Sequence, residues 1–486
     1  TIRSLNISPE KIVGQFTLKE AAWLAIKNST DERLCFQFES GQQEILTAKE
    51  WKAILVNNRW AVSAYGTVFD QSNGRGVVAD ILGFWYAERK RLQAEKKKYA
   101  TLAKEEKDPV KKVEYKKLEE HFDLLQLTKK ISMNSLYGAL LNVAFRFGDE
   151  RMGASVTATG RQITTHMIET IAFLLTGEHS VLQKHVEFDE EEGKYINTYT
   201  CDSPAIIYGD TDSCYYRTFA TNKAEAIEAA DLAAEGVNNS FPAFMRDAFN
   251  CQPGFDTLIK AGREIVGSRG LFQAKKKYMI KVVDMEGFAV DKMKSMGSEI
   301  KKADTPKIIQ KFLKTTVDMI LDGKPYHELA DYVNSQRREI LKKKMNVFSL
   351  GVAKQVNNLE KYMAEYRVPG TFRSKNGGKL TIPGHVRAAC NYNALLEEFD
   401  KGSKPIKSGD KVLVYYLKKN DRDLKSIAIP AEFTRFPDWF VENFQVDIKK
   451  TEERMFDSKL SGVFTAAFNK EVPTPQSVLT NSLLEF

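Results

Sequence analysis

The pattern of hydrophobic and polar positions in the first third of the chain predicts mixed α and β structure. Residues 60–69 alternate between apolar and polar side chains in the way typical of a β-hairpin, and a short helix is expected to open at Ser8. From Val77 to Leu141 the sequence is poor in glycine and rich in Ala, Glu, Lys, Leu and Arg. This stretch predicts two long helices joined by a charged turn near Asp108-Pro109.

The middle of the chain predicts a helix followed by two strands. Helical periodicity covers Arg151 to Leu175. The apolar run Ala205-Ile-Ile-Tyr208 then meets Gly209-Asp-Thr-Asp-Ser213 and Cys214-Tyr-Tyr216, which indicates a strand, a turn and a second strand.

The last third favours helices first and strands later. Asp304-Thr-Pro-Lys307 is expected to open a helix, with Asp304 or Thr305 as its cap and Pro306 in its first turn. Helical patterns continue to about Met363. Residues 411–417 predict a strand after a segment rich in glycine and proline, 369–384, and the chain ends in a polar tail with an apolar tip.

The amino-acid composition is that of a large folded protein without membrane spans or disulfide bonds. A chain of 486 residues, 43% of them hydrophobic, exceeds one common domain and predicts two or three folded units. No apolar run approaches the roughly 20 residues that cross a bilayer, so no membrane association is expected. Five scattered cysteines without a C-x-x-C pair argue against zinc and disulfides and indicate a reducing, cytoplasmic compartment.

The net charge of +8 permits a polyanionic partner without requiring one. Basic residues gather in clusters, and each cluster by itself is more often a solvated helix face. The clusters are Arg89, Lys90, Arg91 and Lys96 to Lys98; Lys275 to Lys277; Arg337 with Arg338; and Lys342 to Lys344.

Two carboxylates stand out between the predicted strands at residues 205–216. Asp210 and Asp212 are two residues apart, so both side chains are expected on one side of a strand or at one hairpin tip. Oxygen ligands suit Mg²⁺, and two such ions can stabilise the attacking and leaving oxygens of a phosphoryl transfer. Gly-Asp-Thr-Asp-Ser is also ordinary turn chemistry, and the motif alone does not separate the two interpretations.

A second group of polar residues lies in the predicted helix before Leu141. Lys130, Asn134, Tyr137 and Gly138 fall at i, i+4, i+7 and i+8, so they share one face. Lysine and asparagine can bind a triphosphate, and a tyrosine beside a glycine leaves room for a base pair. The alternative is an amphipathic helix whose Tyr137 belongs to a core.

The two motifs occur together with a third, and jointly they resemble family B DNA polymerases of the T-even-like phage type. Asn134-Ser-Leu-Tyr-Gly138 resembles the motif of the fingers helix, Tyr208-Gly-Asp-Thr-Asp-Ser213 the carboxylate motif of the palm, and Lys276-Lys-Tyr278 the K-x-Y element. Further matches follow in the family's order: Gly267-Ser-Arg-Gly270, Asp284-Met-Glu-Gly287, Lys294-Ser-Met-Gly297 and Thr305-Pro-Lys307.

The resemblance implies roles for particular residues. Asp210 and Asp212 would be the catalytic, metal-binding carboxylates of the palm, holding two Mg²⁺ ions, and Glu264 would be either a further palm carboxylate or a surface glutamate. Arg89, Lys130 and Asn134 would face the incoming deoxynucleoside triphosphate. Relatives often carry a lysine four residues after the arginine, where this chain has Gln93. The remaining carried-over residues are Tyr137 and Gly138 at the nascent base pair; Lys276 and Tyr278 at the primer-template DNA; and Leu483, Leu484 and Phe486 as a sliding-clamp tail, which could instead dock on its own domain.

One expected part of the active site does not appear in this sequence. The family uses a third aspartate followed by a Ser-Leu-Tyr-Pro-Ser element, and Thr1-Ile-Arg resembles what comes just after that element. A split polymerase, intein processing and a defined fragment would each account for this. In every case the chain is expected to bind DNA alone but to need an amino-terminal polymerase and exonuclease portion for full activity.

The expected fold is therefore α+β, with the right-hand polymerase arrangement of an antiparallel palm sheet, two-helix fingers and a mainly helical thumb. The expected activity is DNA-directed DNA polymerisation in the cytoplasm, and the alternative is a non-catalytic DNA-binding or assembly subunit of a replication complex. The expected domains are palm 1–75, fingers 76–141, palm 142–290, thumb 291–475 and clamp-binding tail 476–486.

Overall fold

The computed structural model describes residues 1–142, 144–189, 194–302, 305–341, 346–368, 371–372 and 382–474. The chain divides into two compact units, Thr1–Glu264 and Ile265–Phe486. Their boundary falls inside the segment 142–290 that the sequence assigns to the second part of the palm. No helix within the described ranges is both long enough and apolar enough to cross a membrane.

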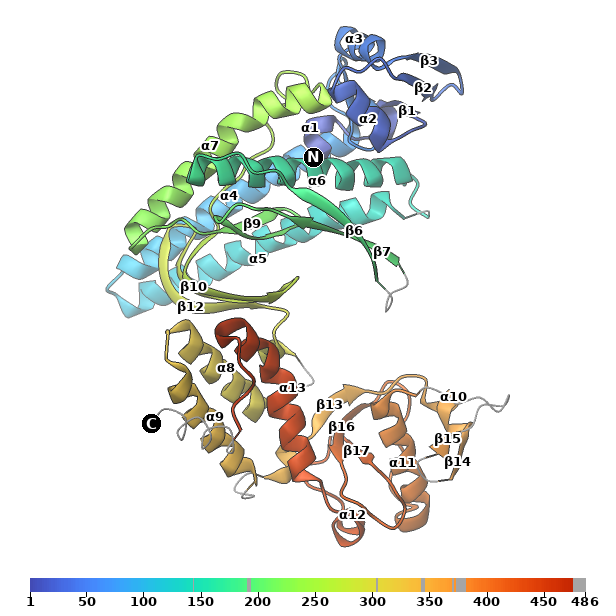
Figure 1. Cartoon of the computed structure of the whole chain (residues 1–486), viewed down its shortest axis with the longest axis vertical. Coiled ribbons are helices and arrows are strands. Elements are labelled where there is room, and N and C mark those ends of the chain that lie inside the picture. The colour runs from blue at the N-terminus through green and yellow to red at the C-terminus, as the bar shows by residue number, and fades with distance from the viewer. Residues whose placement is uncertain are drawn as a thin grey trace. The chain divides into compact units, whose positions relative to one another are not determined.

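The first unit combines long helices with antiparallel strands (Figure 1). Its helices are α1 (Ile2–Leu5), the 3-10 helix η1 (Pro9–Lys11), α2 (Glu20–Lys27), α3 (Ala48–Asn58), α4 (Val77–Glu105), α5 (Pro109–Leu140), α6 (Glu150–Thr176) and α7 (Lys223–Phe249). Its strands are β1 (Ile12–Phe16), β2 (Arg33–Phe38), β3 (Gln43–Thr47), β4 (Trp60–Val62), β5 (Thr67–Asp70), β6 (Gln183–Asp189), β7 (Lys194–Thr200), β8 (Ile206–Asp210) and β9 (Ser213–Tyr216).

Five of these strands form one antiparallel sheet with the order β3-β2-β1-β5-β4. Its core is aromatic, because the buried rings of Phe16 and Phe36 pack with centroids 4.7 Å apart and both contact Trp51 of α3. The indole N–H of Trp51 donates to the carbonyl of Leu34 at 3.1 Å, so the ring is buried without losing a hydrogen bond. The hairpin expected within residues 60–69 is confirmed as β4 and β5.

The helices α4 and α5 form a long antiparallel pair (Figure 1). Tyr99 stacks on Phe122 with centroids 5.5 Å apart, and Lys96 pairs with Asp123 at 2.7 Å. Asp108 caps α5 by accepting from the backbone N–H of Val110, and Pro109 occupies the first helical position, where no N–H is needed. The predicted pair of helices with a turn at Asp108-Pro109 is confirmed.

The helix α6 connects the other parts of the first unit. Ser155 shares a 2.9 Å hydrogen bond with Ser63, and Thr159 accepts from the backbone N–H of Ala64 at 3.0 Å, so α6 is joined to the β4–β5 turn. Its far end packs on α7, where Gly236 leaves room for Leu174. This helix confirms the one predicted for residues 151–175 and extends one residue beyond each end.

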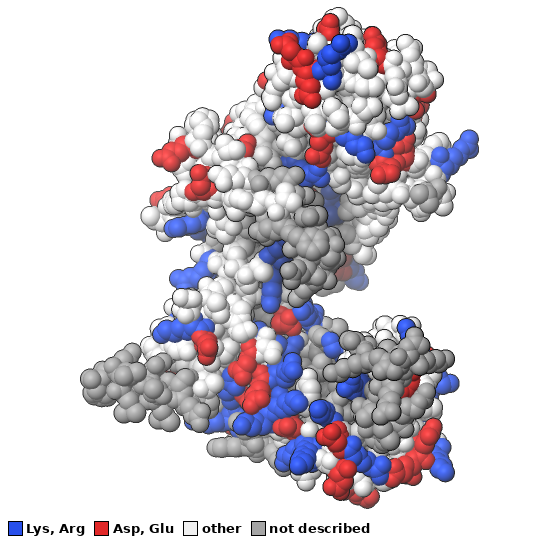
Figure 2. Space-filling view, turned by 45° about the vertical axis from the view of Figure 1, so that its right-hand side comes forward, with Lys and Arg blue, Asp and Glu red and all other residues white. Residues whose placement is uncertain are grey.

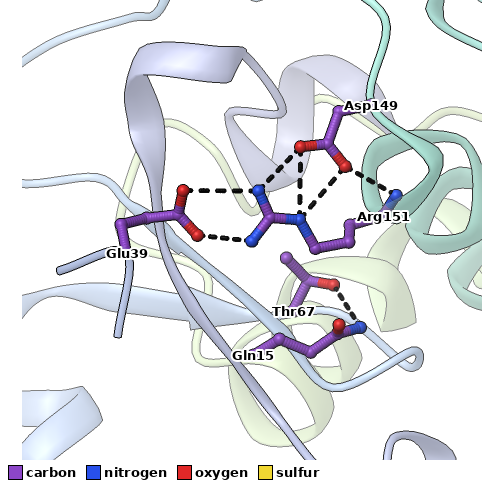
Figure 3. Close-up of polar contacts among 5 residues, drawn as sticks. All are labelled: Gln15, Glu39, Thr67, Asp149 and Arg151. Carbon is purple, nitrogen blue, oxygen red and sulfur yellow. Dashed lines mark hydrogen bonds and ion pairs between the residues drawn. The ribbon is translucent and has the colours of Figure 1, made fainter. Parts of the chain in front are cut away.

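Arg151 anchors the first turn of α6 to the five-stranded sheet (Figure 3). Its guanidinium donates to Asp149 at 2.7 Å and to Glu39, in the turn after β2. Burial opposes ionisation of Asp149, but the hydrogen bonds from Arg151 outweigh it and hold the pKa of Asp149 below its usual value. Both carboxylates in turn raise the pKa of Arg151.

The second unit begins with the three-stranded antiparallel sheet β10-β11-β12 and continues with helices and two further sheets, one of three strands and one of two. Its strands are β10 (Ile265–Ala274), β11 (Lys277–Met285), β12 (Phe288–Met296), β13 (Val352–Gln355), β14 (Tyr366–Val368), β15 (Thr371–Phe372), β16 (Lys411–Tyr416) and β17 (Ser426–Pro430). Its helices are η2 (Glu299–Lys301), α8 (Lys307–Leu321), α9 (Tyr326–Leu341), η3 (Val347–Leu350), α10 (Leu359–Met363), α11 (Gly384–Phe399), α12 (Asp438–Asn443) and α13 (Ile448–Phe468).

Basic and acidic side chains are interspersed over the face of the molecule drawn in Figure 2. The basic pair Arg337 and Arg338 does not form the solvated helix face that such a cluster usually indicates, because Arg337 is buried. Arg337 of α9 is only 3% exposed, lies over the ring of Phe456 and pairs with Glu452 and Asp457 of α13. This cation therefore joins two helices inside the unit, whereas the cluster Lys342 to Lys344 lies outside the described residues.

Several expectations about element boundaries are wrong. A short helix does open at Ser8, which caps the 3-10 helix η1, but the sequence did not predict the helix α1 that precedes it. The cap of α8 is Pro306, without a side-chain hydrogen bond, while Asp304 lies outside the described residues. The helices expected up to Met363 are interrupted by β13, which pairs with β16 at the predicted strand 411–417.

Candidate functional site

Asp210 and Asp212 lie at the tip of the β8–β9 hairpin. Asp210 pairs with Ser213 across the ladder, so only Thr211 and Asp212 form the turn. The backbone N–H of Asp212 donates to the carbonyl of Asp210 at 2.5 Å, and Thr211 has φ +51°. A positive φ at a β-branched residue is strained, and such strain concentrates at functional sites. The hairpin prediction is confirmed, and its turn is unusually tight.

The helix α6 holds this turn in place through two residues one helical turn apart. The hydroxyl of Thr164 donates to the carbonyl of Thr211 at 2.8 Å. On the other side of the turn, a Cβ at Gly209 would lie 2.9 Å from Cδ1 of Ile168. The hairpin can therefore approach α6 only because position 209 has no side chain. Sequence reasoning missed Thr164 and Ile168, because nothing local marks helix residues that support a turn more than 40 positions away.

The two carboxylates differ in their surroundings. Asp210 is half-buried, and its Oδ1 accepts from the hydroxyl of Thr211 at 3.0 Å, whereas Asp212 is exposed. Carboxylate oxygens on one short turn are a donor set that fits a hard divalent cation such as Mg²⁺. Across the described ranges, no three or more His, Cys, Asp or Glu side chains come together as a metal site. Within the described ranges the hairpin thus brings together two carboxylates, fewer than the full ligand set of a divalent cation.

The four residues predicted to share a face all lie in α5. Lys130 and Asn134 are exposed, and Tyr137 is half-buried and not part of the core of the unit. A Cβ at Gly138 would have nothing within 4 Å, so the surface beside Tyr137 is open. The geometry therefore does not support the alternative of a tyrosine enclosed in a core.

Arg89 of α4 lies against this part of α5. Its Nε–H donates to the side-chain oxygen of Gln126 at 3.2 Å, and the neighbouring Glu88 pairs with Lys129 at 2.5 Å. Gln126 precedes Lys130 by one helical turn and lies on the same face of α5. The structure therefore places Arg89 beside the helix face that carries Lys130 and Asn134, although Arg89 precedes both residues by about 40 positions in the sequence.

The other predicted site residues belong to the second unit or to its boundary. Lys276 occupies the turn between β10 and β11 with φ +58°, and Tyr278 is 6% exposed and stacks on Phe272 with centroids 5.5 Å apart. Glu264 is the exposed last residue of the first unit. The clamp-tail residues Leu483, Leu484 and Phe486 lie outside the described residues.

Comparisons with known proteins identify the family of the chain. The family model for DNA polymerase family B matches residues 2–371. The chain is 27% identical over 336 residues to the DNA-directed DNA polymerase of Enterobacteria phage T4, covering 63% of this chain and 33% of that polymerase. It is 26% identical over 370 residues to the DNA-directed DNA polymerase of Escherichia phage RB69, covering 70% of this chain and 37% of that polymerase.

A eukaryotic DNA polymerase is similar to this chain over a stretch of comparable length. The DNA polymerase delta catalytic subunit of Dictyostelium discoideum is 26% identical over 317 residues, which cover 65% of this chain and 24% of the relative. The chain thus matches between 24% and 37% of the length of these curated relatives. Because the family model covers well over half of the 486 residues, the chain belongs to DNA polymerase family B.

Proposed function

We propose that this chain carries the nucleotidyl-transfer site of a DNA-directed DNA polymerase. The observation that carries the proposal is the β8–β9 turn, in which Asp210 and Asp212 are held on α6 by Thr164 and by the close contact at Gly209. A support of this kind limits movement of the carboxylates, and electrostatic catalysis depends on charges that are already in position.

The two helices α4 and α5 would bind the incoming deoxynucleoside triphosphate. Arg89 and Lys130 supply positive charge, and Asn134 supplies a neutral hydrogen-bond donor. Tyr137 and the open surface at Gly138 would bound the nascent base pair. In this proposal the residues act by positioning, so that the α-phosphate lies in line with the primer 3′ hydroxyl.

The reaction would join the primer 3′ oxygen to the α-phosphate of the nucleotide and release pyrophosphate. Mg²⁺ ions, when bound at Asp210 and Asp212, supply positive charge that stabilises the attacking and leaving oxygens. Asp212 is the more exposed of the two carboxylates and can reach an ion at the surface of the hairpin. Asp210, fixed by the hydroxyl of Thr211, would orient the same site from within the strand.

The arrangement of palm, fingers and thumb, with Lys276 and Tyr278 on primer-template DNA and Glu264 as a further palm carboxylate, is part of the same proposal. It is supported by the family match and by the helical hairpin of α4 and α5. We further propose that an amino-terminal polymerase and exonuclease portion completes the carboxylate set, and that the tail at Leu483, Leu484 and Phe486 binds a sliding clamp.

Primer extension tests the proposal. The chain alone, the chain with the amino-terminal portion of the polymerase, and that mixture with Asp212→Ala are compared with Mg²⁺ and all four deoxynucleotides. The mixture should extend the primer, and Asp212→Ala should reduce the rate by at least about a hundredfold because it removes an essential charge.

The matched control is Asp202→Ala, which removes an exposed aspartate from the loop before β8. It should leave the rate within about twofold. Full activity of the chain alone would contradict the proposed need for an amino-terminal portion. An inactive mixture that still binds primer-template DNA would favour a non-catalytic DNA-binding subunit.

A further inference from the structure

The face of α4 that points away from α5 carries a straight row of lysines. Arg89, Lys96 and Tyr99 contact α5, so residues on the opposite side of the helix are turned outward. From Ala87 onward, small residues and lysines alternate along that outward face, at spacings of three and four residues. Its members, here called the α4 track, are Gly83, Ala87, Lys90, Ala94, Lys97, Thr101 and Lys104.

Two arginines from outside the helix extend this charge at its N-terminal end. A Cβ at Gly83 would lie 3.5 Å from a terminal nitrogen of Arg75 and 3.8 Å from Nε of Arg3. The guanidinium of Arg3 also lies 4.9 Å from the ring centre of Tyr86, and the ammonium of Lys90 lies 5.7 Å from the same centre. Three cations from three segments of chain thus gather around one turn of α4.

Two of these cations, Arg3 and Arg75, have no carboxylate partner among the described residues. Nε of Arg3 is buried without a hydrogen-bond partner among them. Burial and the charge of Arg75 lower the pKa of Arg3. Acidic residues flank the track at Asp80 and Glu105, but none lies on it between these ends. Neighbouring positive charges repel one another, and a bound anionic ligand would offset this repulsion.

The outer face of the partner helix α5 differs in this respect. There, Lys116 and Lys117 are interleaved with Glu114 and Glu120, as expected for a solvated helix surface. The one-sided charge of the α4 track is therefore not a general property of this helical hairpin.

We propose that the α4 track binds the phosphate backbone of single-stranded nucleic acid. Successive lysines are seven residues apart, or roughly 10.5 Å at 1.5 Å per residue, so the row from Lys90 to Lys104 is straight over about 21 Å. A flexible strand can follow a straight row. The backbone of a duplex turns away within about half a helical turn, roughly 17 Å. The small residues between the lysines allow a strand to approach closely.

This inference goes beyond the proposed catalysis and does not depend on it, because binding is measured without nucleotides or metal ions. The unpaired template of a polymerase offers the required ligand. The probes are a fluorescently labelled oligothymidylate and a blunt-ended duplex of equal length, with affinity read from anisotropy over a range of salt concentrations.

The test variant is Lys90→Ala with Lys97→Ala and Lys104→Ala. Three phosphate contacts on a single strand contribute about 2 to the slope of log affinity against log salt, so the slope should fall by about 2. At roughly 0.1 M salt the affinity for oligothymidylate should fall between about tenfold and a hundredfold. Affinity for the duplex should change less.

The matched control is Lys111→Ala with Lys116→Ala and Lys117→Ala, which removes the same charge from α5. It should change the affinity for oligothymidylate by less than about threefold. Equal losses in both variants would mean that binding follows total charge, and an unchanged affinity in the test variant would mean that the track binds no strand. A loss on duplex as large as that on oligothymidylate would overturn the assignment to single strands.

Discussion

Gly209 is the position at which the support of the proposed catalytic turn, the β8–β9 turn with Asp210 and Asp212, can be tested most directly. In the Gly209→Ala variant the new methyl group would lie 2.9 Å from Cδ1 of Ile168, whereas carbon atoms normally approach to roughly 3.5–4.0 Å. Ile168 is 5% exposed and has little room to move. Relief therefore requires a strained rotamer of Ile168 or a shift of the hairpin by up to about 1 Å. Overpacking of this kind costs about 1–3 kcal/mol.

The same contact gives the expected result of a second substitution. Ile168→Val removes the atom that the new methyl group would meet and by itself costs about 0.5–1.5 kcal/mol. In that background Gly209→Ala should cost less than about 1 kcal/mol, so the two substitutions should couple favourably. Urea denaturation measures the free energy of unfolding of all four proteins.

Activity should respond more strongly than stability. Asp210 follows Gly209 directly, and misplacement of a catalytic group by about 1 Å can cost a hundredfold in rate. Primer extension with the completed polymerase should therefore fall at least about tenfold in Gly209→Ala and recover in part when Ile168→Val is added.

The control is Gly160→Ala on α6, where a Cβ would have nothing within 4 Å. That change should stabilise the helix by up to about 1 kcal/mol, because alanine is the better helix former. The reasoning is refuted if Gly209→Ala is as harmless as the control, or if Ile168→Val brings back neither stability nor activity.

Two further predictions concern ion pairs. Arg337→Met leaves Glu452 buried without its cation and should lower the free energy of unfolding, measured by urea denaturation, by about 3–5 kcal/mol. Most of this loss should be recovered when Glu452→Gln is added. An Arg337→Met variant as stable as the parent protein would contradict the importance of this ion pair. Arg151 lowers the pKa of Asp149 in the native state. The parent protein should therefore be more stable than Asp149→Asn above pH about 3.9, the pKa of aspartate in the unfolded chain. This difference should disappear as the pH falls through the lower native pKa. Urea denaturation at several pH values measures this, and a difference unchanged near pH 2 would refute it.

Much of the local structure could be predicted because its determinants are close together in sequence. The helical pair α4 and α5 follows from periodicity, and its turn from the capping residue Asp108 and from Pro109. The β8–β9 hairpin follows from apolar runs on either side of residues that favour turns. The prediction failed where an element is too short for its sequence pattern to distinguish helix from strand. Strand β13 is such an element, and it is stabilised by pairing with β16, about 60 positions later in the sequence.

The sequence by itself determined the types of the candidate groups: the two aspartates two residues apart, the spacing of Lys130, Asn134 and Tyr137 along one helix face, and the family to which they belong. Only the tertiary structure showed what positions them. It placed α6 against the β8–β9 turn and Arg89 against Gln126. It also gathered Arg3 and Arg75 at one end of the α4 track. Side-chain spacing along a helix or strand is set by backbone geometry, whereas contacts between distant segments depend on how whole elements pack.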